Sequence, residues 1–350
     1  MKATVYRGAR DVRLETVPDP TIRDSHDAIV RVTRAAICGS DLWFYRGVTE
    51  LTPGTRTGHE FIGIVEEAGG DVHGLHRGDL VVAPFAWSDG TCQFCEAQLQ
   101  TSCVHGGFFG TKNGGTENGG QAELVRVPFA DGTLVRLPEA IASDSGKLDA
   151  AATLCDVMGT GHYGVLAADT APNSTVVVVG DGAVGLCAVL SAAKLARAKE
   201  VIAVGHNAKR LEIATRFGAT RTLNAHDAGV QDEIIELTRG GAPHVVEAVG
   251  NQESFELAVN ITRPGGVVGL VGVPHGVTSA PITTMFYRHI SLHGGPAPVR
   301  AYLPELIAGL EAGRIDPSPV LDLTLPLDRV AEGYAAMDER RATKVLLAVA

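Results

Sequence analysis

Three short fragments of the chain carry side chains that could bind a catalytic metal ion. The fragments are Cys38-Gly39-Ser40-Asp41, Gly58-His59-Glu60 and Leu154-Cys155-Asp156-Val157-Met158-Gly159-Thr160-Gly161. A catalytic zinc needs about three protein ligands among cysteine, histidine and carboxylate side chains, and it keeps one position open for water or substrate. Cys38, His59 and Asp156 form such a set. Zn²⁺ held there would act as a Lewis acid on a substrate oxygen and lower the pKa of a substrate hydroxyl.

Residues beside these ligands suggest supporting roles in catalysis. Glu60 is a nearby carboxylate that can replace a departing metal ligand. Asp41 can accept a hydrogen bond from His59 and hold the imidazole in one tautomer, as groups behind metal ligands commonly do. Ser40 can hydrogen-bond the substrate oxygen and take its proton. Ser40, Asp41 and Glu60 are therefore catalytic candidates.

A glycine-rich motif further along the chain predicts a dinucleotide site. Gly180-Asp181-Gly182-Ala183-Val184-Gly185 follows the apolar run 175–179 and precedes a stretch of helix-forming residues. In this context Gly180 permits a tight turn, Gly182 lets a pyrophosphate approach the backbone, and Gly185 lets helix and strand pack closely. The pyrophosphate would lie on the N–H groups of the helix N-terminus. The candidate cofactor contacts here are Gly180, Gly182, Ala183, Val184, Gly185 and Thr160.

The residues about twenty positions later indicate which nicotinamide cofactor binds. An NAD enzyme usually places an Asp or Glu there, where it accepts from the ribose 2′-hydroxyl. In this chain the position is Gly205, and the potential donors His206, Asn207, Lys209 and Arg210 follow it. A 2′-phosphate would meet no repulsion, so the sequence favours NADP(H) over NAD(H). The alternative is that Lys209 and Arg210 are solvated helix residues and that NAD binds without the acid.

The elements that must position these residues are of two kinds. Up to about residue 150, short β-rich runs alternate with Gly, Asp and Pro turns, a pattern typical of an all-β, partly barrel-like domain. From about Ala151 to residue 295, strands and helices alternate, which predicts a parallel, doubly wound sheet. We expect strands at 28–32, 61–66, 80–84, 123–128, 176–179, 201–204, 245–247, 266–271 and 290–293, with helices at 183–196 and 208–218.

The tail from Pro298 follows neither pattern cleanly. It predicts helices over 301–311 and 328–339, a proline-rich turn over 316–319, and a closing strand over 344–349. We expect this tail to return to the first domain.

Bulk composition excludes several classes of protein. The chain has 350 residues, 45% hydrophobic and 20% charged, which fits two folded domains. The net charge of −10 and the lack of a dense Lys/Arg run argue against a nucleic-acid partner. The N-terminus lacks the apolar core of a signal peptide, and no apolar stretch of about 18 residues predicts a membrane span. We therefore expect a cytoplasmic protein with a small-molecule substrate.

The metal fragments, together with the order β-rich domain, nucleotide domain and β-rich tail, resemble the zinc-containing alcohol dehydrogenases of the medium-chain dehydrogenase/reductase superfamily. The resemblance covers nearly the whole chain. It implies an α/β protein with a GroES-like catalytic domain, residues 1–157 with 298–350, and a Rossmann-type domain, residues 158–297. It also implies a zinc-dependent oxidoreductase that transfers a hydride between an alcohol, or its aldehyde or ketone, and NAD(P), acting as a homodimer or homotetramer.

The same resemblance bears on individual residues. In that family the third zinc ligand is a cysteine or aspartate four residues before a Thr-Gly pair, which here is Asp156. Cys155 is the rival, but adjacent side chains diverge, so both cannot easily face one metal. Relatives often have a proton-relay histidine where this chain has Trp43. Trp43 then either shapes the substrate pocket or leaves the relay to another group. Phe85 and Phe109 are further pocket candidates, with a core role as the alternative, and an apolar substrate is favoured.

A second cluster resembles the structural-zinc lobe of the family. Its residues are Asp89, Cys92, Cys95 and Cys103, and Asp89 stands where the family normally has a cysteine. A carboxylate can ligate zinc, and a cysteine cluster in a reducing compartment is more often a metal site than a disulfide framework. Two alternatives remain: the lobe holds no metal, or His105 is the fourth ligand.

Other functions are compatible with parts of this pattern. Polyol and sugar dehydrogenases share the same metal set. A zinc-independent quinone or enone reductase has the same fold and needs no metal, and a non-enzymatic protein on this scaffold would need no open coordination site. The joint presence of Cys38, His59 and Asp156 favours the zinc enzyme over the last two.

Overall fold

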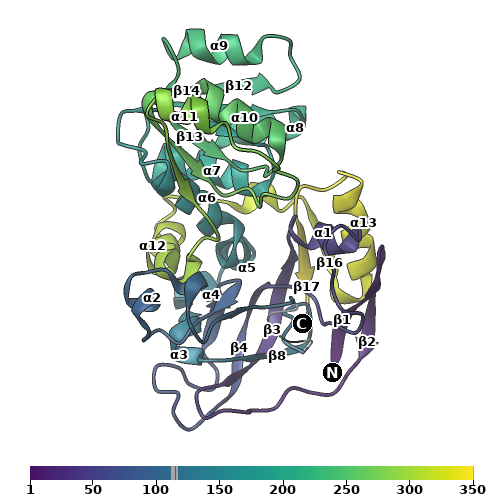
Figure 1. Cartoon of the computed structure of the whole chain (residues 1–350). Helices are drawn as coiled ribbons and strands as arrows, with labels where there is room; N and C mark the ends of the chain where they lie inside the picture. Colours follow the sequence, from purple (N-terminus) through teal and green to yellow (C-terminus); the bar gives the residue numbers. More distant parts are fainter. Residues whose placement is uncertain (112–114, 116, 350) are drawn as a thin grey trace. The chain divides into compact units, whose positions relative to one another are not determined.

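The computed structural model describes residues 1–111, 115 and 117–349, which form two compact units (Figure 1). Unit 1 contains Met1–Asp156 and the segment from Pro298 onward, and unit 2 contains Val157–Ala297. The division falls after Asp156, one residue earlier than the boundary expected from the sequence. No helix in the described part of the chain is long and apolar enough to cross a membrane.

Unit 1 is built on a seven-stranded sheet in the order β16-β17-β3-β4-β5-β9, with β8 paired to β3. The strands are β3 (Ala28–Ile37), β4 (Glu60–Ala68), β5 (Leu80–Ala83), β8 (Leu124–Val127), β9 (Val135–Arg136), β16 (Leu323–Pro326) and β17 (Val345–Ala348). The last two come from the C-terminal segment, drawn in yellow in Figure 1, and β17 lies antiparallel to β3. The tail therefore completes the sheet of the first unit.

Strand β3 is five residues longer than the sequence indicated, because its second half has partners on both sides. Ala35 pairs with Phe61 of β4 and with Leu347 of β17. The closing strand thus extends the sheet to Ile37, directly before Cys38.

Smaller elements surround this sheet. The hairpin β1 (Lys2–Gly8) and β2 (Asp11–Thr16) and the short pair β6 (Ala86–Trp87) and β7 (Gly107–Phe108) form two-stranded sheets. The helices are α1 (Asp41–Tyr45), α2 (Gln93–Glu96), η1 (Gln100–Ser102), α3 (Ala130–Thr133), α4 (Glu139–Ala142), α5 (Ser145–Ala151), η3 (Ala152–Cys155), α12 (Val299–Glu311), η4 (Ser318–Val320), η5 (Leu327–Arg329) and α13 (Val330–Asp338). The α13 helix follows the predicted 328–339 closely.

Unit 2 is a six-stranded parallel sheet in the order β12-β11-β10-β13-β14-β15. Its strands are β10 (Thr175–Val179), β11 (Glu200–Gly205), β12 (Arg221–Asn224), β13 (Ala242–Glu247), β14 (Thr262–Leu270) and β15 (Ser291–Gly294). Its helices are α6 (Val157–Ala167), α7 (Ala183–Lys194), α8 (Ala208–Phe217), α9 (Val230–Leu237), α10 (Gln252–Ile261) and α11 (Ile282–Tyr287). Strand order reverses between β10 and β13, the position at which such sheets bind ligands.

Candidate catalytic metal site

The three predicted ligands come from three segments that the unit 1 sheet brings together. Cys38 directly follows β3, and His59 directly precedes β4. Because Ala36 pairs with Glu60 across these antiparallel strands, the two ligand positions become neighbours. Asp156 follows η3, which packs against both strands. As a result, Asp156 Oδ2 lies 3.3 Å from Cys38 Sγ and 3.2 Å from His59 Nε2.

The donor set at this site fits zinc. One ligand atom each from Cys38, His59, Glu60 and Asp156 lies within 4.8 Å of the others. A thiolate, an imidazole nitrogen and a carboxylate are the ligands that zinc accepts in catalytic sites. Burial, with the charges of Asp156 and Glu60, raises the pKa of Cys38 to about 11. A bound divalent cation supplies the charge needed to hold that thiol as a thiolate.

Asp41 holds two of the ligands in place. Its Oδ2 accepts the Cys38 N–H at 3.0 Å, and its Oδ1 lies 3.3 Å from His59 Nδ1. Burial by itself lowers the pKa of His59, but the Asp41 charge and hydrogen bonds with Asp156, Asp41 and Cys38 raise it well above its usual value. The ring is therefore held between Asp41 on its Nδ1 side and Asp156 on its Nε2 side.

Glu60 has a buried partner that the sequence analysis did not find. Lys344 Nζ lies 2.8 Å from Glu60 Oε1 and 2.5 Å from Oε2, and it also donates to the Ile37 carbonyl at 3.3 Å. Both side chains are almost fully buried. Burial raises the pKa of Glu60, whereas the Lys344 charge opposes that rise. A lysine at the first position of the predicted closing strand was the only sequence signal for this pair.

Two further candidates from the sequence, Cys155 and Phe109, lie outside the group of metal ligands. The Cys155 thiol is fully buried and donates to the Phe61 carbonyl at 3.3 Å, and it is outside the ligand cluster. Phe109 is a core residue, edge-on to Phe61 and Trp87 at 5.1 Å each, so of the two roles considered for it the structure supports the core role. Complete packing between two aromatic rings leaves it no face for a substrate.

Three other candidates are only partly buried. Phe85 lies edge-on to His59, with ring centroids 6.3 Å apart, and stacks on Phe108. Ser40 is the N-cap of α1, and Trp43 lies in that helix, where its N–H donates to the Ser40 carbonyl at 3.2 Å. Their partial exposure leaves Ser40, Trp43 and Phe85 able to contact a small molecule at this site.

The second cluster forms the cysteine-rich lobe of unit 1. Ligand atoms of Asp89, Cys92, Cys95 and Cys103 lie within 4.8 Å of one another, and Cys92 Sγ is 3.6 Å from Cys95 Sγ. His105 is outside that group: its Nδ1 lies 2.8 Å from Asp89 Oδ2. Asp89, and not His105, therefore belongs to the group of side chains that could hold a metal ion here.

The glycine motif of unit 2 has the shape that a pyrophosphate requires. Gly180 has a φ of +121°, which favours glycine, and a Cβ on Gly185 would overlap the Gly180 carbonyl. A Cβ on Gly182, the N-cap of α7, would meet only open space, so this glycine leaves room for a ligand. The N–H groups of Ala183 and Val184 begin the helix there. Thr160 is buried in α6.

The end of β11 differs from the sequence interpretation. Asp181 Oδ2 accepts the N–H groups of His206 at 2.8 Å and Asn207 at 2.7 Å, and Arg210 Nη1 lies 4.0 Å from Oδ1. Lys209 is exposed on α8. A carboxylate does stand beside Gly205, so the premise that none is present was wrong. The sequence motif considers only the residue at the end of the second strand, here Gly205. It cannot detect a carboxylate that reaches this place from Asp181, 24 residues earlier in the chain.

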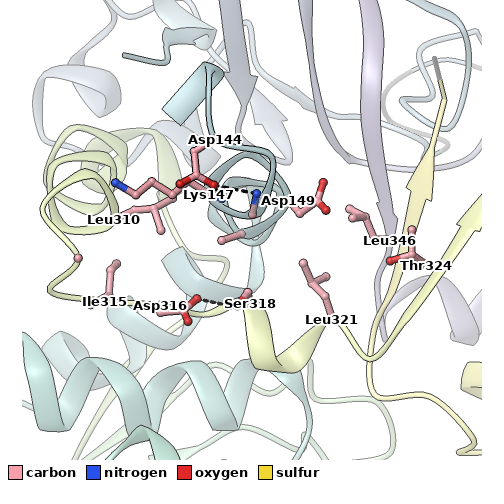
Figure 2. Close-up of a pocket in the computed structure, with 13 residues that line it drawn as sticks. Asp144, Lys147, Asp149, Leu310, Ile315, Asp316, Ser318, Leu321, Thr324 and Leu346 are labelled. Carbon is pink, nitrogen blue, oxygen red and sulfur yellow. Dashed lines mark hydrogen bonds between the residues drawn. The ribbon is translucent and has the colours of Figure 1, made fainter. Parts of the chain in front are cut away.

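A groove of unit 1 is lined by none of the candidate metal ligands, and Figure 2 shows the residues that line it. The lining residues come from α5, from the end of α12 and from the C-terminal strands. The lining also contains no residue of the Asp89, Cys92, Cys95 and Cys103 group. Its four charged groups are already engaged. Asp144 caps α5, Asp149 accepts from Arg34 at 2.6 Å, Lys147 donates to the Glu311 carbonyl, and Asp316 accepts from the Ser318 N–H at 3.0 Å. This groove offers no catalytic constellation.

Comparison with known proteins agrees with this fold and site. Residues 24–139 match the family model of the alcohol dehydrogenase GroES-like domain, and residues 183–310 match that of zinc-binding dehydrogenases. The chain is 39% identical to a probable zinc-binding alcohol dehydrogenase of Mycobacterium tuberculosis, over 97% of this chain and 86% of that protein. It is 35% identical to an uncharacterized zinc-type alcohol dehydrogenase-like protein of Bacillus subtilis, over 97% of each.

A solved structure gives the same result. The alcohol dehydrogenase TADH from Thermus sp. ATN1 aligns over 100% of both chains with a TM-score of 0.93 and 34% identity. The chain therefore belongs to the zinc-containing medium-chain alcohol dehydrogenase family, as its sequence predicted.

Proposed function

We propose that this protein is a zinc-dependent oxidoreductase that transfers a hydride between an alcohol, or its aldehyde or ketone, and a nicotinamide dinucleotide. The observation that carries this proposal is the buried convergence of Cys38, His59 and Asp156 from three separate segments. A zinc ion bound to them supplies Lewis acidity at the substrate oxygen, which lowers the pKa of the hydroxyl. Comparison with alcohol dehydrogenases of the same family supports the substrate class.

The residues around the metal ligands have distinct roles in this proposal. Ser40 takes the hydroxyl proton and Trp43 borders the substrate. Asp41 fixes the orientation of His59 and the backbone of Cys38. Lys344 holds the Glu60 carboxylate, which is close enough to the ligands to join them. A zinc-independent quinone or enone reductase is not favoured, because it would have no use for this buried ligand set.

We also infer a second, structural zinc in the cysteine-rich lobe, ligated by Asp89, Cys92, Cys95 and Cys103. His105, hydrogen-bonded to Oδ2 of Asp89, keeps that carboxylate oriented. Metal analysis of the purified protein should give two zinc ions per chain. In the Cys103→Ser variant one zinc should remain, together with most of the activity; one zinc per chain in the parent protein would contradict the inference.

The nicotinamide cofactor is assigned here only as NAD(P). The sequence favoured NADP(H) because Gly205 stands where an NAD enzyme usually has an acid, and the Asp181 carboxylate beside it removes that ground. A homo-oligomer and a cytoplasmic location remain predictions. An oligomer is supported by β15, an edge strand whose four residues are exposed, and by the exposed apolar side chains of α11.

The proposal is tested with a panel of primary and secondary alcohols, polyols and ketones, each assayed with both cofactors. Oxidation of at least one alcohol class with reduction of the nicotinamide is expected. Reduction of quinones or enones alone, at a rate independent of zinc content, would overturn it. The polyol series distinguishes a sugar-type dehydrogenase, which shares the same ligands, from one that acts on apolar alcohols.

A further inference from the structure

The carboxylate of Asp181 lies at the end of β11, although the residue belongs to the glycine-rich loop after β10. Its side chain is buried, and Oδ2 accepts two consecutive backbone N–H groups, those of His206 and Asn207. These hydrogen bonds fix the carboxylate between the two strands. The other oxygen, Oδ1, lies 4.0 Å from Arg210 Nη1.

This carboxylate fills the space that a side chain at position 205 would take. A Cβ built on Gly205 would lie 2.7 Å from both Cγ and Oδ2 of Asp181, and it would overlap Asp181 Cβ as well. Gly205 is therefore required by the Asp181 side chain. In NAD-binding folds of this type, the acid that accepts from the ribose 2′-hydroxyl projects from this end of the second strand.

We propose that Asp181 is the cofactor-specificity residue of this protein, accepting the adenosine ribose 2′-hydroxyl through Oδ1 and selecting NAD(H) over NADP(H). The inference rests on the proposed nicotinamide-linked function and names the cofactor of that site. In this protein the acid belongs to the glycine-rich loop and not to the strand, but its carboxylate lies at the same strand end.

The surroundings of Asp181 also disfavour a 2′-phosphate. Backbone N–H groups directly before a helix can bind phosphate oxygens, and the two directly before α8, those of His206 and Asn207, already donate to a carboxylate. A 2′-phosphate placed there would face the negative charge of Asp181 in a buried setting. If that charge is removed, Arg210 and the exposed Lys209 become partners for the phosphate.

The test measures binding of NAD⁺ and NADP⁺ to the purified protein by calorimetry, without an alcohol substrate. The parent protein should bind NAD⁺ more tightly. Asp181→Asn keeps an oxygen that can accept the two N–H groups, removes the charge and puts an NH2 group in place of the second carboxylate oxygen. It should shift the NAD⁺/NADP⁺ affinity ratio toward NADP⁺ by at least about tenfold, since like-charge contacts cost several kcal/mol.

A relocation variant tests the position of the charge. Asp181→Gly combined with Gly205→Asp returns the carboxylate to the strand end; glycine is needed at 181 because even an alanine Cβ would overlap the new side chain. This double variant should regain the preference for NAD⁺ that Asp181→Asn loses. Circular dichroism checks whether Asp181→Asn folds. If it does not, the double variant alone tests the proposal, and loss of its preference for NAD⁺ would overturn it.

Two other results would also overturn the inference: tighter binding of NADP⁺ by the parent protein, or an unchanged ratio in folded Asp181→Asn. Failure of the parent protein to bind either dinucleotide would instead contradict the proposed function itself. The two failures are thus distinguishable.

Discussion

At the scale of single residues, two neighbours in the sequence differ in whether their side chains join the candidate metal site. Asp156 faces Cys38 and His59, whereas the Cys155 thiol points to the Phe61 carbonyl. Asp156→Asn should therefore lose the catalytic zinc and reduce kcat/KM by roughly 1,000-fold, about 4 kcal/mol of transition-state stabilisation. The matched control Cys155→Ala should keep both the zinc and most of the activity. Metal analysis with steady-state kinetics checks this; the reverse result would make Cys155 the ligand.

The buried pair of Lys344 and Glu60 leads to a prediction about stability. Removing one partner leaves the other charge buried without compensation, so Lys344→Met should lower the unfolding free energy by about 3–5 kcal/mol. Lys344→Arg keeps the charge and should cost less. Adding Glu60→Gln to Lys344→Met should recover part of the loss. Urea unfolding measures all three, and a Lys344→Met protein as stable as the parent would contradict the account of this pair.

At the scale of elements, Asp338 joins the end of α13 to two other segments. Its carboxylate, 7% exposed, accepts from Arg46 after α1 at 2.6 Å and lies 2.7 Å from Arg10 of the β1–β2 turn. The Arg46 hydrogen bond and the charges of both arginines lower the pKa of Asp338 despite its burial. Because the folded pKa lies below the unfolded one, this stabilisation is complete above the unfolded value, about 4, and is lost as pH falls through the folded value.

Asp338→Asn should therefore lower the unfolding free energy by about 1–2 kcal/mol at pH 7, and the difference should shrink as the pH falls below about 4. The control is Glu339→Gln, because Glu339 is 57% exposed and pairs with Arg341 at the surface. It should change stability by less than about 1 kcal/mol. Chemical unfolding across this pH range is the measurement. Equal destabilisation by Asp338→Asn at all pH values would rule out a charge effect.

The elements that the sequence predicted best are those whose side chains are buried on both faces. The run 175–179 became β10, and the helix after it begins at Ala183 as expected. The edge strand β12, Arg221–Asn224, was missed because its half-exposed residues carry no apolar run. Contacts between residues far apart in the sequence could not be predicted either. Neither the Lys344–Glu60 pair nor the contact of Asp181 with the end of β11 follows from a local sequence pattern. Ligand types and spacing, by contrast, were enough to pick out the side chains that the structure brings within 4.8 Å of one another.

At the scale of the whole molecule, the open edge of the unit 2 sheet predicts self-association. Strand β15 is exposed along its length, and Phe286 and Tyr287 of α11 are 74% and 77% exposed. Exposed aromatic side chains and an exposed strand at a sheet edge are each typical of an interface. Phe286→Glu with Tyr287→Ser should lower the mass found by light scattering, whereas Val48→Glu, at a residue 61% exposed in unit 1, should not. A monomeric parent protein would contradict this prediction.

The central claim is that a zinc ion held by Cys38, His59 and Asp156 is required for alcohol oxidation. The most direct measurement removes zinc from the parent protein with a chelator and follows zinc content, cofactor binding and alcohol oxidation in the same samples. Activity should fall with loss of one of the two zinc ions and return when Zn²⁺ is added back, while dinucleotide binding persists. Full alcohol oxidation by protein free of zinc would contradict the account.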